Sequence, residues 1–181
     1  YTTAAMLIKA GWSVCLQASV AQKPSEELVR AIAEFEEAGG YSTAFNIEKI
    51  TQANVIVDGL LGTGVKGELS DELVSIINAV NNSAAWVLSL DVPSGIEPNT
   101  GWARQVAIEA NMTLTFGAIK QGLLTSQARH CCGELILADI GLSPYLPQSN
   151  LKKLVSDDLP KVFKPRRRDS HKGDSGKVTV I

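Results

Sequence analysis

Hydrophobic residues recur along this chain with two periods, one typical of buried strands and one typical of amphipathic helices. Apolar positions at helical spacing include Leu28, Ile32 and Phe35, and later Leu73, Ile76, Ile77 and Val80. Short apolar runs between these helices predict strands, which fall at 13–18, 42–47, 54–58, 86–91, 113–117 and 134–138. Strands that alternate with helices in this way predict an α/β fold, namely a three-layer, Rossmann-like, doubly wound and mainly parallel sheet.

Capping residues set the boundaries of the predicted helices. Ser25 before two glutamates begins one helix, which the Gly39-Gly40 pair ends. Ser70 before Asp71 and Glu72 begins another, over 69–82. The first residues are typical of a helix already under way, which Gly11 ends, and 177–181 resemble the start of a strand. We therefore expect the chain to be a portion of a longer protein.

The stretch 54–67 combines a buried strand, a glycine-rich loop and the start of a helix. Asp58 closes the apolar run, and Gly62, Gly64 and Gly67 follow it. Glycines allow a backbone to approach a ligand closely, and the helix that follows presents free N–H groups and the positive end of its dipole to an anion. This arrangement favours a phosphate or pyrophosphate ligand, although a tight structural turn would explain the glycines equally well.

The glycine spacing G-x-G-x-x-G, followed by Asp91 at the end of another apolar run, is also the fingerprint of dinucleotide binding. The unit lies in mid-chain, however, and the predicted helix begins after the third glycine, which argues against a standard oxidoreductase. The loop also lacks the G-K-[ST] ending of nucleoside triphosphatases.

Several polar residues follow predicted parallel strands, where ligands bind in such sheets. They are Asp58, the glycine loop, Asp91, Ser94 and Lys120. Their convergence predicts a ligand site, whereas each aspartate alone could be a helix cap or a turn residue, and Lys120 alone a surface lysine.

Composition narrows the classes of protein. The 181 residues suffice for one α/β domain with a core, and 45% hydrophobic and 20% charged residues are ordinary globular values. The net charge of −2 provides no general attraction to nucleic acid or membranes, and no apolar run is long enough to span a bilayer. A basic cluster at 161–168 is interpreted as a solvated segment between domains.

The cysteines point to a reducing compartment, and we expect a cytoplasmic protein. Their number is odd, three, and Cys131 and Cys132 are adjacent, which does not suit a disulfide framework. His130 beside them lacks further ligands at zinc spacing.

Four motifs in order resemble the NAD(P)H-hydrate epimerase family, also called the YjeF N-terminal domain. They are Val57-Asp-Gly-Leu-Leu-Gly-Thr-Gly64, Ser89-Leu-Asp-Val-Pro-Ser-Gly95, Thr115-Phe-Gly-Ala-Ile-Lys-Gln-Gly-Leu123 and the stretch from Gly133 to Gly141. The segment 164–174 resembles the opening of the ADP-dependent NAD(P)H-hydrate dehydratase domain of bacterial bifunctional repair enzymes. The resemblance implies an epimerase domain at 1–145, a linker at 146–163 and the beginning of a dehydratase domain at 164–181.

The resemblance implies metabolite repair: epimerisation of the S and R forms of NAD(P)H hydrate, so that a stereospecific dehydratase can restore both to NAD(P)H. The resemblance also implies that Asp58 and Ser94 are ligands of a potassium ion. It implies that Asp91 contacts the substrate as a catalytic acid or base, and that Lys120 is an anion partner or an aid to proton transfer. ADP would serve the dehydratase domain alone. The substrate-contacting loop would comprise Gly62, Thr63, Gly64, Val65, Lys66, Gly67 and Glu68.

One part of the family pattern lies outside this sequence. The Asn-Asn-Gly-Gly-Asp-Gly motif, which supplies a further potassium ligand, would come immediately before Tyr1. Two other hypotheses remain at this point: an NAD(P)-dependent oxidoreductase and a non-catalytic scaffold of the same fold. A homo-oligomer is a further open expectation, and we expect no nucleic-acid or membrane partner.

Overall fold

The computed structural model describes residues 1–18, 24–64, 67–146 and 156–158. The chain divides into two compact units, 1–144 and 145–181. All of the candidate site residues belong to the first unit. Three predicted segments lie outside the described residues: the strand at 177–181, the basic cluster at 161–168 and the dehydratase segment at 164–181. Most of the predicted linker lies outside them as well.

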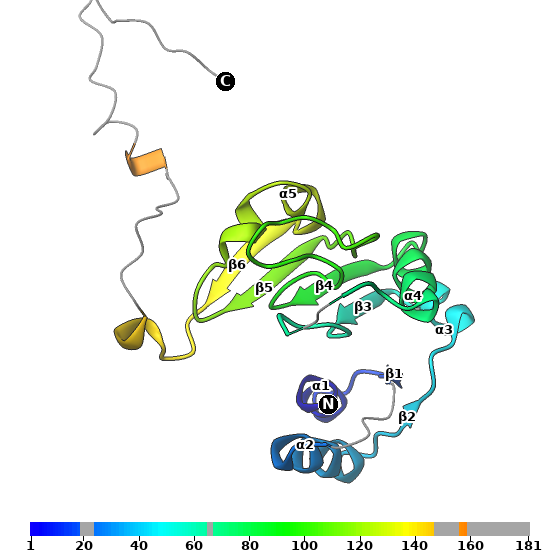
Figure 1. Ribbon diagram of the computed structural model, residues 1–181. Helices are drawn as coiled ribbons and strands as arrows, with labels where there is room; N and C mark the ends of the chain where they lie inside the picture. The colour runs from blue at the N-terminus through cyan, green and yellow to red at the C-terminus, as the bar shows by residue number, and fades with distance from the viewer. Residues whose placement is uncertain (19–23, 65–66, 147–155, 159–181) are drawn as a thin grey trace, which may run out of the picture. The chain divides into compact units, whose positions relative to one another are not determined.

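A four-stranded sheet positions the site (Figure 1). Its strands are β3 (Val55–Asp58), β4 (Trp86–Leu90), β5 (Met112–Phe116) and β6 (Glu134–Ala138), in that spatial order and paired in parallel. The carboxyl ends of parallel strands lie at one edge of a sheet. The structure thus confirms the predicted parallel α/β architecture.

Helix α4 (Asp71–Asn81) covers part of this sheet. Its N-cap is Ser70, whose side chain accepts a hydrogen bond from the backbone N–H of Leu73, and two acidic residues occupy the first turn. Ile76, Ile77 and Val80 lie on its buried face and belong to a core cluster with Val87 of β4. Burial of this apolar stripe, more than helix propensity, holds α4 on the sheet.

The first residues form a smaller element pair with its own core. Strands β1 (Leu16–Gln17) and β2 (Ser42–Thr43) pair in parallel, and α1 (Thr2–Lys9) and α2 (Glu26–Glu37) share a cluster centred on Phe35. The ring of Tyr1 meets that of Phe35 edge to face, with 5.8 Å between ring centroids.

Two predicted strands in this region were too long. The strand expected at 13–18 is reduced to β1, and the strand expected at 42–47 ends at Thr43. The rest of the segment predicted as a strand at 42–47 leads into helix α3 (Ile47–Thr51). This helix begins after Asn46 because the Asn46 side chain accepts a hydrogen bond from the backbone N–H of Lys49.

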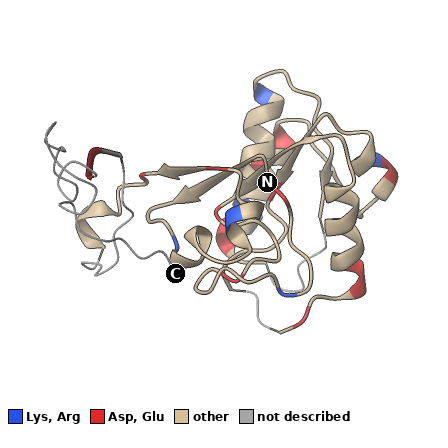
Figure 2. Cartoon of the chain, turned by 90° about the horizontal axis from the view of Figure 1, so that it is seen from above, with Lys and Arg blue, Asp and Glu red and all other residues tan. Residues whose placement is uncertain are grey.

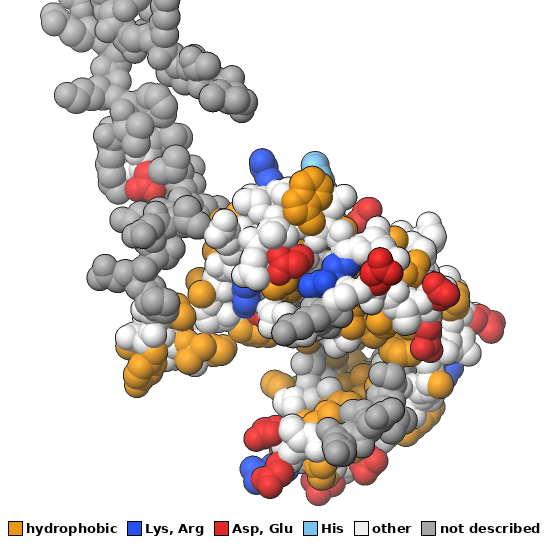
Figure 3. Space-filling model, viewed as in Figure 1, with side chains coloured by type: hydrophobic (Ala, Val, Ile, Leu, Met, Phe, Trp, Pro, Cys, Tyr) orange, Lys and Arg blue, Asp and Glu red, His pale blue; other side chains and the backbone are white. Residues whose placement is uncertain are grey.

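Shorter helices complete the described chain: η1 (Gln121–Leu124), α5 (Ala128–Cys131), η2 (Ser143–Tyr145) and η3 (Ser156–Asp158). Within the described ranges, no helix is both long enough and apolar enough to cross a membrane. Acidic and basic residues are scattered over several elements (Figure 2), and one face shows both signs side by side (Figure 3). This mixed surface agrees with the low net charge.

Candidate functional site

The carboxylate of Asp58, at the end of β3, is the centre of a buried hydrogen-bond cluster. Its Oδ1 accepts from the Ser94 hydroxyl at 2.6 Å and from the backbone N–H of Leu60 at 3.2 Å. Its Oδ2 accepts from the Ser89 hydroxyl at 2.8 Å and from the backbone N–H of Ser94 at 2.9 Å. Asp58 is only 3% exposed, so it cannot contact a large substrate directly.

Burial raises the pKa of Asp58, and the hydrogen bonds from Ser94, Ser89 and Leu60 oppose that rise. The two ion pairs found in the described part of the chain, Arg30–Glu26 and Lys120–Asp91, do not involve it. A buried carboxylate without a cationic partner is a group that a bound cation would compensate.

The donor types around Asp58 fit potassium. The carboxylate and the hydroxyls of Ser94 and Ser89 are hard oxygen donors of the kind that such cations take. The protein's own hydrogen bonds also hold the carboxylate in place without an ion, so the cluster does not need a cation to be ordered.

The glycine loop follows this cluster and is tied to it, since the backbone N–H of Leu61 donates to the Ser94 hydroxyl at 2.9 Å. Gly62, Thr63 and Gly64 are exposed, and Val65 and Lys66 lie outside the described residues. A Cβ placed on Gly62 or Gly64 would meet nothing within 4 Å, and neither residue has a positive φ. The fold itself therefore does not require glycine at these two positions.

Two residues that the sequence analysis did not identify hold the far end of the loop. A guanidinium N–H (Nη1) of Arg104 donates to the carbonyl of Gly67 at 3.1 Å, and the side-chain oxygen of Gln105 accepts from the backbone N–H of Leu69 at 3.1 Å. Gly67 has a φ of +83°, which favours glycine for a conformational reason, and Glu68 beside it is exposed. No sequence motif marks Arg104 or Gln105.

Asp91 follows β4 in a turn with an unusual backbone. Its φ is +69°, rare for a residue other than glycine, and its backbone N–H donates to the carbonyl of Leu114 in β5 at 2.8 Å. Gly95, four positions later, has a φ of +99°, and a Cβ there would lie 2.2 Å from the carbonyl oxygen of Val106. The turn is therefore held in a strained form at a position expected to carry function.

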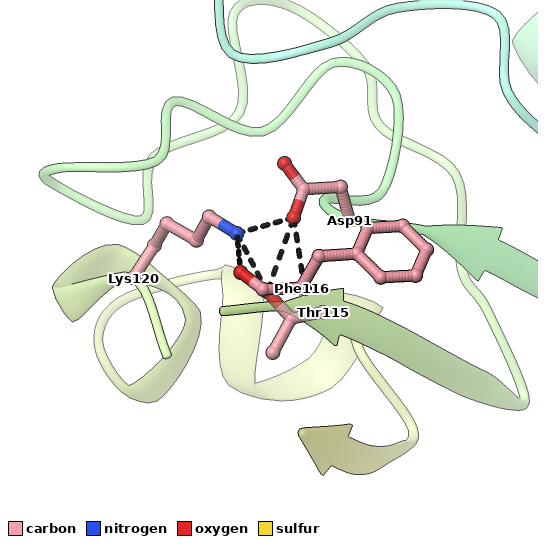
Figure 4. Close-up of polar contacts among 4 residues, drawn as sticks. All are labelled: Asp91, Thr115, Phe116 and Lys120. Atoms are coloured by element: carbon pink, nitrogen blue, oxygen red, sulfur yellow. Dashed lines mark hydrogen bonds and ion pairs between the residues drawn. The ribbon is translucent and has the colours of Figure 1, made fainter. Parts of the chain in front are cut away.

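Lys120 lies just before η1 and reaches back to Asp91 (Figure 4). Its ammonium donates to Oδ1 of Asp91, to the Thr115 hydroxyl at 3.0 Å and to the carbonyl of Phe116 at 3.1 Å. The side chains of Lys120 and Asp91 are 23% and 28% exposed, so a ligand can reach this pair.

The structure thus groups the predicted residues into two clusters at the carboxyl edge of the sheet. Asp58 and Ser94 contact each other in the buried cluster, and Asp91 and Lys120 contact each other in the accessible one. Ser89 and Thr115 join them as partners that the sequence analysis missed. Both residues open motifs that carry the family resemblance, and both are polar residues in apolar strands, but neither signal assigns them a role. In the structure each is 0% exposed.

A parallel sheet with polar residues and a glycine loop beyond its strand ends defines a Rossmann-like domain with its candidate site in the usual ligand-binding position. The sequence pattern of the family described as YjeF-related protein N-terminus matches residues 1–122, and the chain belongs to this family.

Two proteins that are similar in sequence are much longer than this chain. The protein named bifunctional NAD(P)H-hydrate repair enzyme Nnr from Escherichia coli is 35% identical over 184 residues, which cover 100% of this chain and 36% of that protein. The protein of the same name from Coxiella burnetii is 41% identical over 141 residues, or 72% of this chain and 27% of its own length. The chain thus spans about a third of these relatives or less.

The crystal structure of a yeast protein called ynu0, or YNL200c, has a similar fold. Its TM-score is 0.62 at 15% identity, over 71% of this chain and 56% of that one. At this identity the likeness supports the Rossmann-like fold and nothing further.

Proposed function

We propose that this domain interconverts the S and R epimers of NAD(P)H hydrate, as the first activity of a bifunctional repair protein. Membership of the YjeF-related family and the names of the relatives support this proposal. The observation that carries it is the accessible Asp91–Lys120 pair next to the turn that holds Ser94, at the ligand-binding edge of the sheet.

The reaction needs a group that moves a proton. Water added to the reduced nicotinamide ring leaves a hydroxyl on a carbon bonded to the ring nitrogen. Inversion can proceed when the hydroxyl loses its proton, the carbon–nitrogen bond breaks to give an aldehyde, and the nitrogen gains a proton. Closure on the other face of the aldehyde reverses these steps. Asp91 is proposed as the acid and base that carries the proton between the two atoms.

The glycine loop is proposed to receive the rest of the dinucleotide. Gly62 and Gly64 are exposed and have open space where a Cβ would project, so a ligand can approach their backbone closely. Thr63, Val65, Lys66, Gly67 and Glu68 complete the proposed substrate-contacting loop. The N-terminus of α4 follows it: its backbone N–H groups attract a pyrophosphate group, and the carboxylates of Asp71 and Glu72 in its first turn oppose that attraction.

Potassium and ADP complete the proposal. Potassium would be held by Asp58 and Ser94 and would supply positive charge beside the buried carboxylate. ADP would serve the dehydratase portion of the longer protein. All three cysteines are free, which suits a reducing compartment such as the cytoplasm.

The test follows epimer interconversion by NMR in the full-length natural protein without ADP. Asp91→Asn should lower the rate by about two to four orders of magnitude while the thermal melt stays close to that of the wild type. A folded Asp91→Asn variant with a near-normal rate would remove Asp91 from the mechanism. Oxidation or reduction of the nicotinamide in this assay would instead favour an oxidoreductase.

A further inference from the structure

Thr115 links the two residues proposed to carry out the chemistry. Its hydroxyl oxygen accepts a hydrogen bond from the Lys120 ammonium at 3.0 Å and lies 3.4 Å from Oδ1 of Asp91, to which it donates (Figure 4). Thr115 is 0% exposed, so its hydroxyl cannot touch a substrate. Any role it has in the reaction therefore acts through Lys120 and Asp91.

The hydrogen bonds of Lys120 leave no donor for a ligand. An ammonium has three N–H groups, and their three acceptors are Asp91 Oδ1, Thr115 Oγ1 and the Phe116 carbonyl. Two of these acceptors come from consecutive residues at the end of β5, so the strand itself fixes where the ammonium lies.

The two carboxylate oxygens of Asp91 have different surroundings. Oδ1 accepts from Lys120, from the Thr115 hydroxyl and from the backbone N–H of Phe116 at 3.1 Å. No residue in the described ranges donates to Oδ2, which points away from these three partners (Figure 4). Oδ2 is therefore the oxygen that can exchange a proton with a ligand.

We propose that Thr115 is a positioning residue, which holds the Lys120 ammonium on Oδ1 of Asp91 and so directs Oδ2 toward the substrate. The inference rests on the proposed epimerase function and assigns separate tasks to the residues of that site. Lys120 anchors one carboxylate oxygen, Asp91 moves the proton through the other, and Thr115 keeps the anchor in place.

Thr115→Val tests this role, because valine keeps the shape of threonine and removes the hydroxyl. The anchor should loosen and kcat for epimerisation should fall about 10- to 100-fold, as misplaced catalytic groups do, with KM changed less than about twofold. Thr115→Ser, which restores the hydroxyl, should recover kcat to within about threefold of the wild type.

Thr113→Val is the matched control. Thr113 lies two positions earlier on β5, is also 0% exposed, and its hydroxyl donates to the Cys132 carbonyl at 2.8 Å, away from Asp91. This variant should lose a similar amount of thermal stability to Thr115→Val and keep its kcat. Equal losses of kcat in the two variants would show a merely structural role for Thr115.

The outcomes separate the two proposals. A wild type that does not interconvert the epimers would overturn both. A second outcome would overturn only the role of Thr115. In that outcome the wild type is active, Asp91→Asn inactivates it, and Thr115→Val keeps kcat within about twofold. If Thr115→Val does not fold, Thr115→Ser decides alone: a large loss of kcat in a variant that keeps the hydroxyl would contradict the proposal.

Discussion

Ser94 donates both its hydroxyl and its backbone N–H to the carboxylate of Asp58, at 2.6 and 2.9 Å. The two residues are 36 positions apart, so this contact joins the end of β3 to the turn that follows β4. The same turn begins with Asp91 and therefore reaches from the buried cluster to the accessible pair. The proposed catalytic carboxylate thus shares a turn with a buried hydrogen-bond network that a large substrate cannot reach.

Asp58→Ala should destabilise the protein by about 2–4 kcal/mol, because it leaves buried donors of Ser89, Ser94 and Leu60 without their acceptor. Urea denaturation measures the change. Asp139→Ala is the matched control: Asp139 also follows a strand and accepts two local hydrogen bonds, from Gly141 and Ser143, but it is exposed. That variant should lose less than about 1 kcal/mol, and equal losses would contradict the importance of the buried cluster.

Potassium should strengthen binding of the hydrate if it compensates Asp58. Because an epimerase does not consume its substrate, the equilibrium mixture of epimers is a stable probe for calorimetry with the full-length protein in the absence of ADP. We expect Kd to rise about fivefold or more when potassium is replaced by tetramethylammonium at constant ionic strength.

Asp58→Asn, which keeps the shape and removes the charge, serves as the control for this experiment. Its Kd should be the same in both salts. A wild type that binds equally well in both salts would show that Asp58 is a structural residue without a cation.

The sequence predicted the sheet well where strands are buried and flanked by strong turn signals. β6 has the predicted bounds, and β3, β4 and β5 lie within one residue of theirs. Helix α3 was missed because five residues carry too little periodicity to be distinguished from a strand. Strands β1 and β2 are shorter than predicted. They form a two-stranded sheet, and the length of such strands depends on tertiary neighbours more than on local sequence.

The sequence predicted only those site residues that lie at or after the end of a recognisable strand. Asp58, Asp91, Ser94 and Lys120 stood out as polar residues after apolar runs. The partners Ser89 and Thr115 depend on the register between strands, such as the pairing of Asp58 with Ser89, and on the left-handed backbone of Asp91. Neither property can be derived from one sequence without the fold.

The cysteines provide a test of the packing around β6. Burial raises the pKa of Cys132 to about 11 and also raises that of Cys131, whereas Cys15 is exposed. A raised pKa lowers the fraction of reactive thiolate, so at pH 8 the native protein should react rapidly with Ellman's reagent at Cys15 alone. Unfolding in urea should release the other two thiols, and Cys15→Ser should abolish the rapid phase. Rapid reaction of Cys131 or Cys132 in the native state would contradict this packing.

The last prediction separates a glycine required by the ligand from one required by the fold. Gly62 has no positive φ and open space around its Cβ position, so Gly62→Ala should change the free energy of unfolding by less than about 0.5 kcal/mol. The added methyl group would nevertheless stand between the loop and a dinucleotide, and the KM for the hydrate should rise about fivefold or more.

Gly95→Ala is the contrasting variant. Its φ of +99° and the carbonyl of Val106, 2.2 Å from the Cβ position, predict a loss of about 2 kcal/mol or more in stability. Urea denaturation and epimerisation kinetics on both variants give the comparison. Neither backbone conformation nor packing requires glycine at position 62, so contact with the substrate is the remaining reason for it. A Gly62→Ala protein with wild-type KM would therefore show that this residue does not contact the substrate.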